Sequence, residues 1–60
     1  MRKKYGMKAY GRTVWFGTQE EMMSFLLEWI ANTEGSERDR ADTALSNLLG
    51  GQPFTDTDAI

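Results

Sequence analysis

The chain has no cysteine and no histidine, and no run of apolar residues is longer than three, as in Phe25-Leu26-Leu27. Without cysteine there is no disulfide and no thiolate metal site. Without histidine the commonest ligand of zinc and copper is also missing. An apolar run of this length is far too short to cross a bilayer, which takes about 20 residues. We therefore expect a soluble cytoplasmic protein with no metal, no cofactor and no membrane partner.

The same absences argue against catalysis. Histidine is the usual general base near neutral pH, and without it or cysteine the serines lack a normal activating partner. The six glycines are scattered along the chain apart from the pair Gly50-Gly51, so no phosphate-binding loop is present. A chain of 60 residues also leaves little room for a buried cleft around two carboxylates. We predict that the protein is not an enzyme and has no small-molecule substrate.

Size and charge indicate a partner instead. A chain this short hides only roughly 60% of its surface on folding, and small domains usually add a disulfide, a metal or a partner. Since the first two are missing, we expect a homodimer. Five of the seven basic residues lie in the first twelve positions, which contain none of the nine acids. This asymmetry suggests one face for an anionic partner, or two copies that attract each other head to tail. The alternative is that the basic and acidic parts neutralise each other within the fold.

Residues 4–16 have the pattern of a β-hairpin. Aromatic and β-branched residues flank Gly11-Arg12, and a two-residue loop that begins with glycine suits a type II′ turn. This loop pairs Tyr10 with Thr13. One face of the hairpin then carries Tyr5, Met7, Ala9, Val14 and Phe16. The other face carries the residues predicted to bind a partner, which are Lys4, Lys8, Tyr10, Arg12 and Trp15.

Two helices are predicted after the hairpin. Thr18 and Glu21 have the spacing of a capping box and predict a helix over residues 19–32. Ser36 is the expected cap of a second helix that stops at Gly50-Gly51. The predicted fold is therefore α+β, a hairpin followed by two helices (ββαα), in one domain over residues 1–51.

The apolar residues of the first predicted helix, which include Phe25 and Trp29, cover an arc of about 200°. A helix packed on one layer needs a stripe only somewhat over ~100° wide. The second helix offers a thin stripe, because two of its five apolar members are alanine. We therefore expect a second copy of the chain to cover the rest of the first helix. The predicted dimer interface is Met22, Met23, Leu26, Leu27, Trp29 and Ile30.

Residues 52–60 show no useful periodicity and are predicted to form a flexible acidic tail. Asp56 and Asp58 have the chemistry of a hard-cation site. A calcium or magnesium site needs further oxygen ligands, so we expect both carboxylates to be solvated.

The hairpin residues suggest two classes of partner. Tryptophan, tyrosine and arginine are favoured anchors in protein interfaces, which favours a protein-binding regulator or inhibitor. Basic and aromatic side chains also bind phosphates and bases, so a small DNA- or RNA-binding regulator is the alternative. A second alternative is that the acidic part mimics nucleic acid. If Trp15 is buried, both the protein-binding and the nucleic-acid-binding hypotheses for the hairpin face are weakened. The short length and general character of this chain are typical of small phage, plasmid and prophage proteins.

The order of elements adds a resemblance to the second class. A strand, a helix, a Gly-Ser turn and a helix match residues 12–16, 19–32, 35–36 and 37–49. In topology this order resembles the ribbon–helix–helix DNA-binding family. The resemblance implies an obligatory dimer in which strands of two chains pair and enter the major groove.

Overall fold

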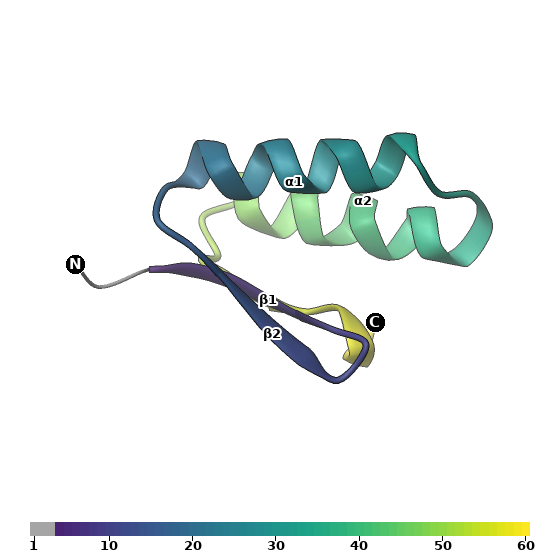
Figure 1. Cartoon of the computed structure of the whole chain (residues 1–60), viewed down its shortest axis with the longest axis horizontal. Coiled ribbons are helices and arrows are strands. Elements are labelled where there is room, and N and C mark those ends of the chain that lie inside the picture. The colour runs from purple at the N-terminus through teal and green to yellow at the C-terminus, as the bar shows by residue number, and fades with distance from the viewer. Residues whose placement is uncertain (1–3) are drawn as a thin grey trace.

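The computed structural model describes residues 4–60, which form a hairpin, two helices and a short third strand (Figure 1). The elements in chain order are β1 (Tyr5–Ala9), β2 (Arg12–Phe16), α1 (Gln19–Ala31), α2 (Gly35–Leu49), β3 (Phe54–Asp56) and a 3₁₀ turn (Thr57–Ala59). The α+β class and the order hairpin, helix, helix are confirmed. The third strand was not expected.

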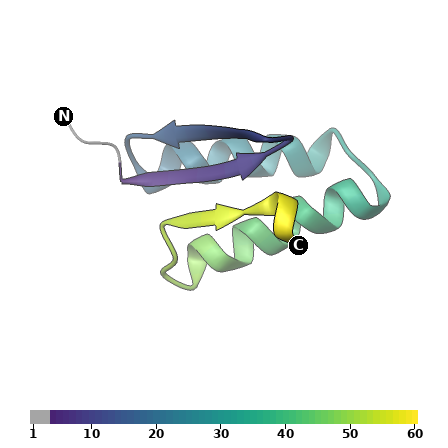
Figure 2. The ribbon, with the colours of Figure 1, turned by 90° about the horizontal axis from the view of Figure 1, so that it is seen from below.

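The molecule has two layers. The sheet has the strand order β2-β1-β3, with β2 antiparallel and β3 parallel to the central strand β1. Both helices lie on one face of this sheet, α1 over the hairpin and α2 over β3 (Figures 1 and 2). Neither α1 nor α2 lies over the opposite face of the sheet.

The hairpin turns one residue earlier than predicted. Its loop is Tyr10-Gly11, and both residues have positive φ (53° and 73°), as a type I′ turn requires. Ala9 therefore pairs with Arg12, and Met7 pairs with Val14. The predicted type II′ turn and its register are wrong. The cause is a distant contact, because the N–H groups of Tyr10 and Gly11 both donate to the Asp58 carboxylate at 2.8 Å.

This register bears on the family resemblance. In ribbon–helix–helix proteins the strand pairs with a second chain, whereas β2 here pairs along its whole length with β1 of its own chain. The new register also places Arg12 opposite the buried Ala9, on the face that the helices cover. The other hairpin side chains lie on the faces predicted for them. Each β1 residue pairs with a β2 residue two positions earlier than predicted, and a shift of two positions leaves the faces unchanged.

The start of α1 is confirmed. The Thr18 hydroxyl accepts a hydrogen bond from the Glu21 N–H at 3.2 Å. The Glu21 carboxylate reaches back to accept from the Gly17 N–H at 3.3 Å, one residue before the position of a standard capping box. The loop from β2 to α1 is therefore tied by side-chain hydrogen bonds at both Gly17 and Thr18.

The start of α2 differs from the prediction, and its end does not. Its N-cap is Glu34, with no side-chain hydrogen bond, so Ser36 lies inside the helix and is not its cap. At the other end Gly50 is the C-cap, and Gly51 has a φ of 98° that suits glycine. The predicted stop at the glycine pair is confirmed.

The core lies between the sheet and the two helices. Met22 and Leu26 of α1 have 0% of their surface exposed, within a single chain. They are core residues, so they have no surface to offer a second copy. The buried alanines Ala41 and Ala44 let α2 pack closely, so a stripe that looked too thin does cover this part of α1. The core cluster is Met7, Ala9, Phe16, Met22, Leu26, Ala44 and Leu48.

The C-terminal segment is part of the domain. The Gly6 N–H donates to the Pro53 carbonyl at 3.0 Å, and the Thr57 hydroxyl donates to the Lys8 carbonyl at 2.6 Å. The inward side chains of this segment are Thr55 and Thr57, with 5% and 0% exposed. The prediction of a flexible tail is therefore wrong. Its buried side is made of threonine, so no apolar periodicity marks it as a strand.

Candidate functional site

The strand β2 is an edge of the sheet with backbone groups available for pairing. Gly6 uses its N–H toward β3, so the pair that it forms with Trp15 is a non-hydrogen-bonded pair of the hairpin. By the alternation of antiparallel pairing, the same holds for Lys8 and Thr13. The N–H and C=O groups of Thr13 and Trp15 therefore point away from β1. They form the free edge of the sheet.

A groove of about 710 Å³ runs beside this edge, between the hairpin and α1. Figure 1 shows the hairpin diverging from α1 toward its turn, which is why the two layers do not close on each other. The groove is lined by Met7 and Ala9 from β1, Tyr10 from the turn, Arg12 and Val14 from β2, and Phe25, Glu28, Trp29 and Asn32 from α1. Its volume is in the range of binding pockets, and most of its lining is apolar.

Aromatic pairs lie at the two ends of the groove. Toward the start of α1, the rings of Phe16 and Phe25 pack with centroids 5.3 Å apart. Toward the hairpin turn, the Tyr10 ring lies 6.3 Å from that of Trp29. The Tyr10 hydroxyl also donates to the Glu37 carboxylate of α2, and this hydrogen bond raises the pKa of Tyr10. The turn is thereby held to both helices, so the wide end of the groove has a fixed wall.

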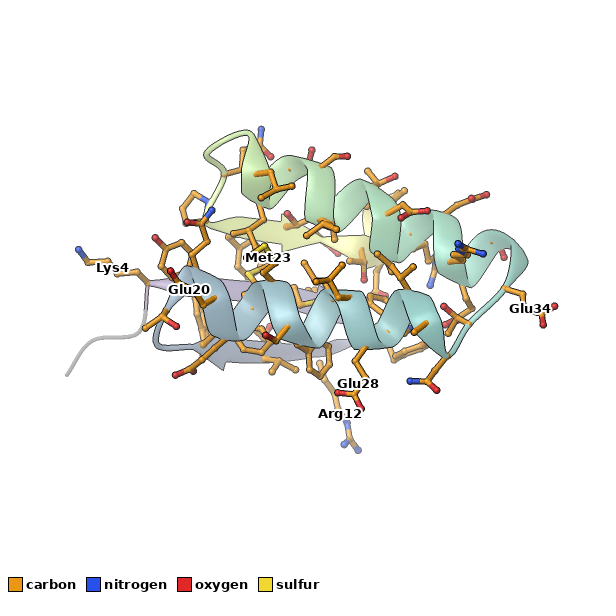
Figure 3. The ribbon with its side chains drawn as sticks, turned by 90° about the horizontal axis from the view of Figure 1, so that it is seen from above. Lys4, Arg12, Glu20, Met23, Glu28 and Glu34 are labelled. Carbon is orange, nitrogen blue, oxygen red and sulfur yellow. The ribbon has the colours of Figure 1, made fainter. Side chains whose placement is uncertain are left out.

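Two opposite charges stand on the walls of the groove. Arg12 comes from β2 and Glu28 from α1. Figure 3 shows both side chains on the side of α1 away from α2. Phe25, on the same wall as Glu28, is 41% exposed, so the apolar lining is accessible from this side. Such an arrangement suits a ligand with apolar side chains and a polar backbone.

The open face of the sheet carries a second feature. Trp15 and Phe54 pack across it with ring centroids 5.7 Å apart, although they come from strands β2 and β3 on either side of β1. Gly6 lies between them, and a Cβ there would be 2.5 Å from Cε3 of Trp15. The indole ring therefore lies over the glycine. Figure 2 views the molecule from this side.

The five residues predicted to bind a partner do not form one surface. Trp15 and Lys8 lie on the open face of the sheet, and Trp15 is half exposed. Tyr10 and Arg12 line the groove on the other face. Lys4 is exposed at the start of β1 and points away from the end of the sheet (Figure 3).

The predicted dimer interface is divided as well. Met22 and Leu26 are in the core, Met23 and Ile30 are half-buried, and Trp29 lines the groove. Leu27 alone of the six is largely exposed. A second copy would therefore find little of the expected apolar surface on α1.

Sequence-based prediction missed the α1 wall of the groove. Its residues are Phe25, Glu28, Trp29 and Asn32, which have the spacing i, i+3, i+4, i+7 of one helix face. The apolar arc of α1 did include Phe25 and Trp29. Its edge toward β2 was not recognised as a separate surface, because that required the angle between helix and hairpin.

The carboxylates of the C-terminal segment have structural partners. Two backbone N–H groups, that of Gly11 and then that of Tyr10, hold the pKa of Asp58 below its usual value. Asp56 accepts a hydrogen bond from the Asp58 N–H at 3.0 Å. Among residues 4–60, no three aspartates or glutamates gather as a metal site would require. Neither α1 nor α2 has the length and apolar character needed to span a membrane.

Comparison of the chain with protein-family models, with curated proteins and with solved structures finds no match.

Proposed function

We propose that this protein is a small non-enzymatic binding protein that regulates or inhibits a partner protein by capturing an extended segment of it. The segment adds to the sheet as a strand beside β2 and places side chains in the groove along α1. The observation that carries the proposal is the groove of about 710 Å³ directly beside a free five-residue edge strand. Strand addition next to a helix-lined groove is an established way to recognise peptides.

The geometry specifies which atoms act. The N–H and C=O groups of Thr13 and Trp15 supply the backbone hydrogen bonds, which give affinity for any extended chain. Side chains of the captured segment alternate between the two faces, so every second one enters the groove beside Val14 and Phe25. The expected segment has apolar residues at alternate positions. Arg12 and Glu28 favour an uncharged segment, or one with charges of both signs.

A second copy of the chain is the competing occupant, and it fits less well. Two β2 strands paired antiparallel about Val14 would offer each groove the helix-facing side chains of the other β2. Those are Arg12, Val14 and Phe16, and Phe16 is already buried in its own core. A homodimer of this kind would therefore leave most of the groove unfilled.

The test begins with extended peptides selected from a random display library against the full chain. In the Trp15→Phe variant, Trp29 in the groove is the only tryptophan, so its emission reports peptide binding. Thr13→Pro removes an outward N–H without removing a hydrogen bond of the hairpin. We expect it to weaken binding at least about tenfold, the effect of roughly one or two backbone hydrogen bonds, while circular dichroism shows an unchanged fold.

A matched pair tests the groove. Phe25 and Leu27 are both exposed apolar residues of α1, and only Phe25 lines the groove. Phe25→Ala should weaken binding and Leu27→Ala should not. The proposal is wrong if the selected peptides bind all three variants as they bind the parent chain, or if no peptide is selected. A dimer in sedimentation that Thr13→Pro dissociates would assign the edge to a second copy instead.

A further inference from the structure

The open face of the sheet is a second surface, separate from the groove. We propose that it binds single-stranded nucleic acid, with bases stacking on Trp15 and Phe54 and with Lys8 and Lys4 contacting phosphates. This inference does not rest on the capture of a protein segment, because its side chains lie on the other face of the sheet.

The aromatic pair has the features of a stacking platform. Trp15 is 50% exposed and Phe54 is 41% exposed, and their rings lie 5.7 Å apart. Gly6 lies between them and has no side chain, so the indole ring of Trp15 packs directly on the backbone of β1. Aromatic residues on the open face of a sheet can each stack a base of a single strand, and here the two rings come from β2 and β3 with β1 between them. Such stacking accepts any base, because each base has a π face.

The charge around the platform is complementary to phosphate. Lys8 lies on the same face as Trp15, opposite Thr13 in the hairpin, and Lys4 is exposed at the start of β1. Asp56 pairs with Lys8 across the parallel strands β1 and β3, and its negative charge offsets the positive charge of Lys8. The expected binding is therefore weak and sensitive to salt.

The size of the face argues against a folded protein or a second copy. The strands β2, β1 and β3 have five, five and three residues. At about 3.3 Å per residue and about 4.8 Å between strands, they give a flat area of roughly 210 Å². A stable protein–protein interface takes about 800 Å² on each partner.

The experiment uses the full chain with Trp29→Phe, so that Trp15 is the only tryptophan. It is titrated with oligothymidylate and oligouridylate of about 8 nucleotides, a length within the site size of known single-strand binders. We expect Trp15 emission to be quenched. The logarithm of affinity should fall by about 1.4 for each tenfold rise in salt, the slope for two lysine–phosphate contacts on a single strand.

Matched variants separate stacking from a general loss of stability. Phe54→Leu should weaken binding about fivefold or more, because one stacked base is lost. Phe25→Leu is the control, since Phe25 is equally exposed, at 41%, and lies in the groove. Asp56→Asn keeps an oxygen that can accept the Asp58 N–H and removes the opposing charge. It should strengthen binding about twofold to fivefold at low salt.

The inference is overturned if no oligonucleotide quenches Trp15 at about 50 mM salt, or if a duplex binds as well as a single strand. It is also overturned if Phe25→Leu weakens binding as much as Phe54→Leu does. None of these results depends on whether peptides bind the groove.

Discussion

Two buried threonines of the C-terminal segment should respond in opposite directions to the same substitution. Within residues 4–60 the buried Thr55 hydroxyl has no hydrogen-bond partner, whereas the Thr57 hydroxyl donates to the Lys8 carbonyl at 2.6 Å. Valine has nearly the shape of threonine and keeps the β-branched side chain that suits a strand. Thr55→Val should therefore stabilise the domain, and Thr57→Val should destabilise it.

The magnitudes follow from the cost of unpaired polar groups. A buried hydroxyl without a partner costs about 1–3 kcal/mol, so its replacement by a methyl group should raise the free energy of unfolding by about 1 kcal/mol. Removal of the Thr57 hydroxyl loses one hydrogen bond and deprives the Lys8 carbonyl of a donor. The expected loss is about 1–2 kcal/mol. The two variants should thus differ by about 2–3 kcal/mol.

The assay is thermal and urea unfolding at neutral pH, followed by circular dichroism. For a domain of this size, 1 kcal/mol moves Tm by about 4–8 °C, so the two variants should melt at least about 8 °C apart. A lower Tm for Thr55→Val would mean that its hydroxyl has a partner, and the packing of β3 would have to be reconsidered. An unchanged Tm for Thr57→Val would mean that this hydrogen bond does not hold the segment to β1.

Two further predictions concern the turn and the open face. Gly6→Ala places a Cβ 2.5 Å from Cε3 of Trp15, so it should lower the free energy of unfolding by about 1–3 kcal/mol. Gly6→Ala combined with Trp15→Ala should recover part of that loss, and no recovery in urea unfolding would refute the contact. Because the folded-state pKa of Asp58 is lowered, its contribution to stability is present above the unfolded value of about 3.9 and is lost as pH falls through the folded pKa. Asp58→Asn should therefore destabilise the domain at pH 7 and weaken the fall in stability below pH ~4, and an identical acid profile for the two proteins would contradict this role.

Two local signals predicted helix ends correctly, whereas a third, Ser36 as a cap, did not. Thr18 as a cap and Gly50-Gly51 as a stop act within a few residues, and both are confirmed. The turn at Tyr10-Gly11 was not predictable, because a tyrosine at positive φ is unusual and is stabilised by a carboxylate 47 and 48 residues away. The strand β3 was missed for a related reason. Its one buried residue, Thr55, is a threonine, as is Thr57 in the 3₁₀ turn that follows, so the segment carries no hydrophobic pattern.

The candidate sites were predictable only in their residue types. The hairpin sequence indicated basic and aromatic surface groups, and Trp15 is indeed exposed. It did not indicate that Arg12 and Trp15 lie on opposite faces, since that depends on where the loop begins. The exposed edge of α1 at Phe25 depends on the angle between two layers. That angle is set by contacts such as that of Tyr10 with Glu37, which link residues far apart in the chain.

The two edges of the sheet differ in a way that bears on which one binds. β3 is three residues long, follows Pro53 and runs directly into a 3₁₀ turn, so it offers little length for another strand. β2 is five residues long, contains no proline and carries a charge only at Arg12. Natural sheets usually protect an edge of this kind with charges, proline or a bulge, because it invites pairing with other chains. The contrast within one small sheet indicates that β2, with the groove beside it, is the edge suited to receiving a partner.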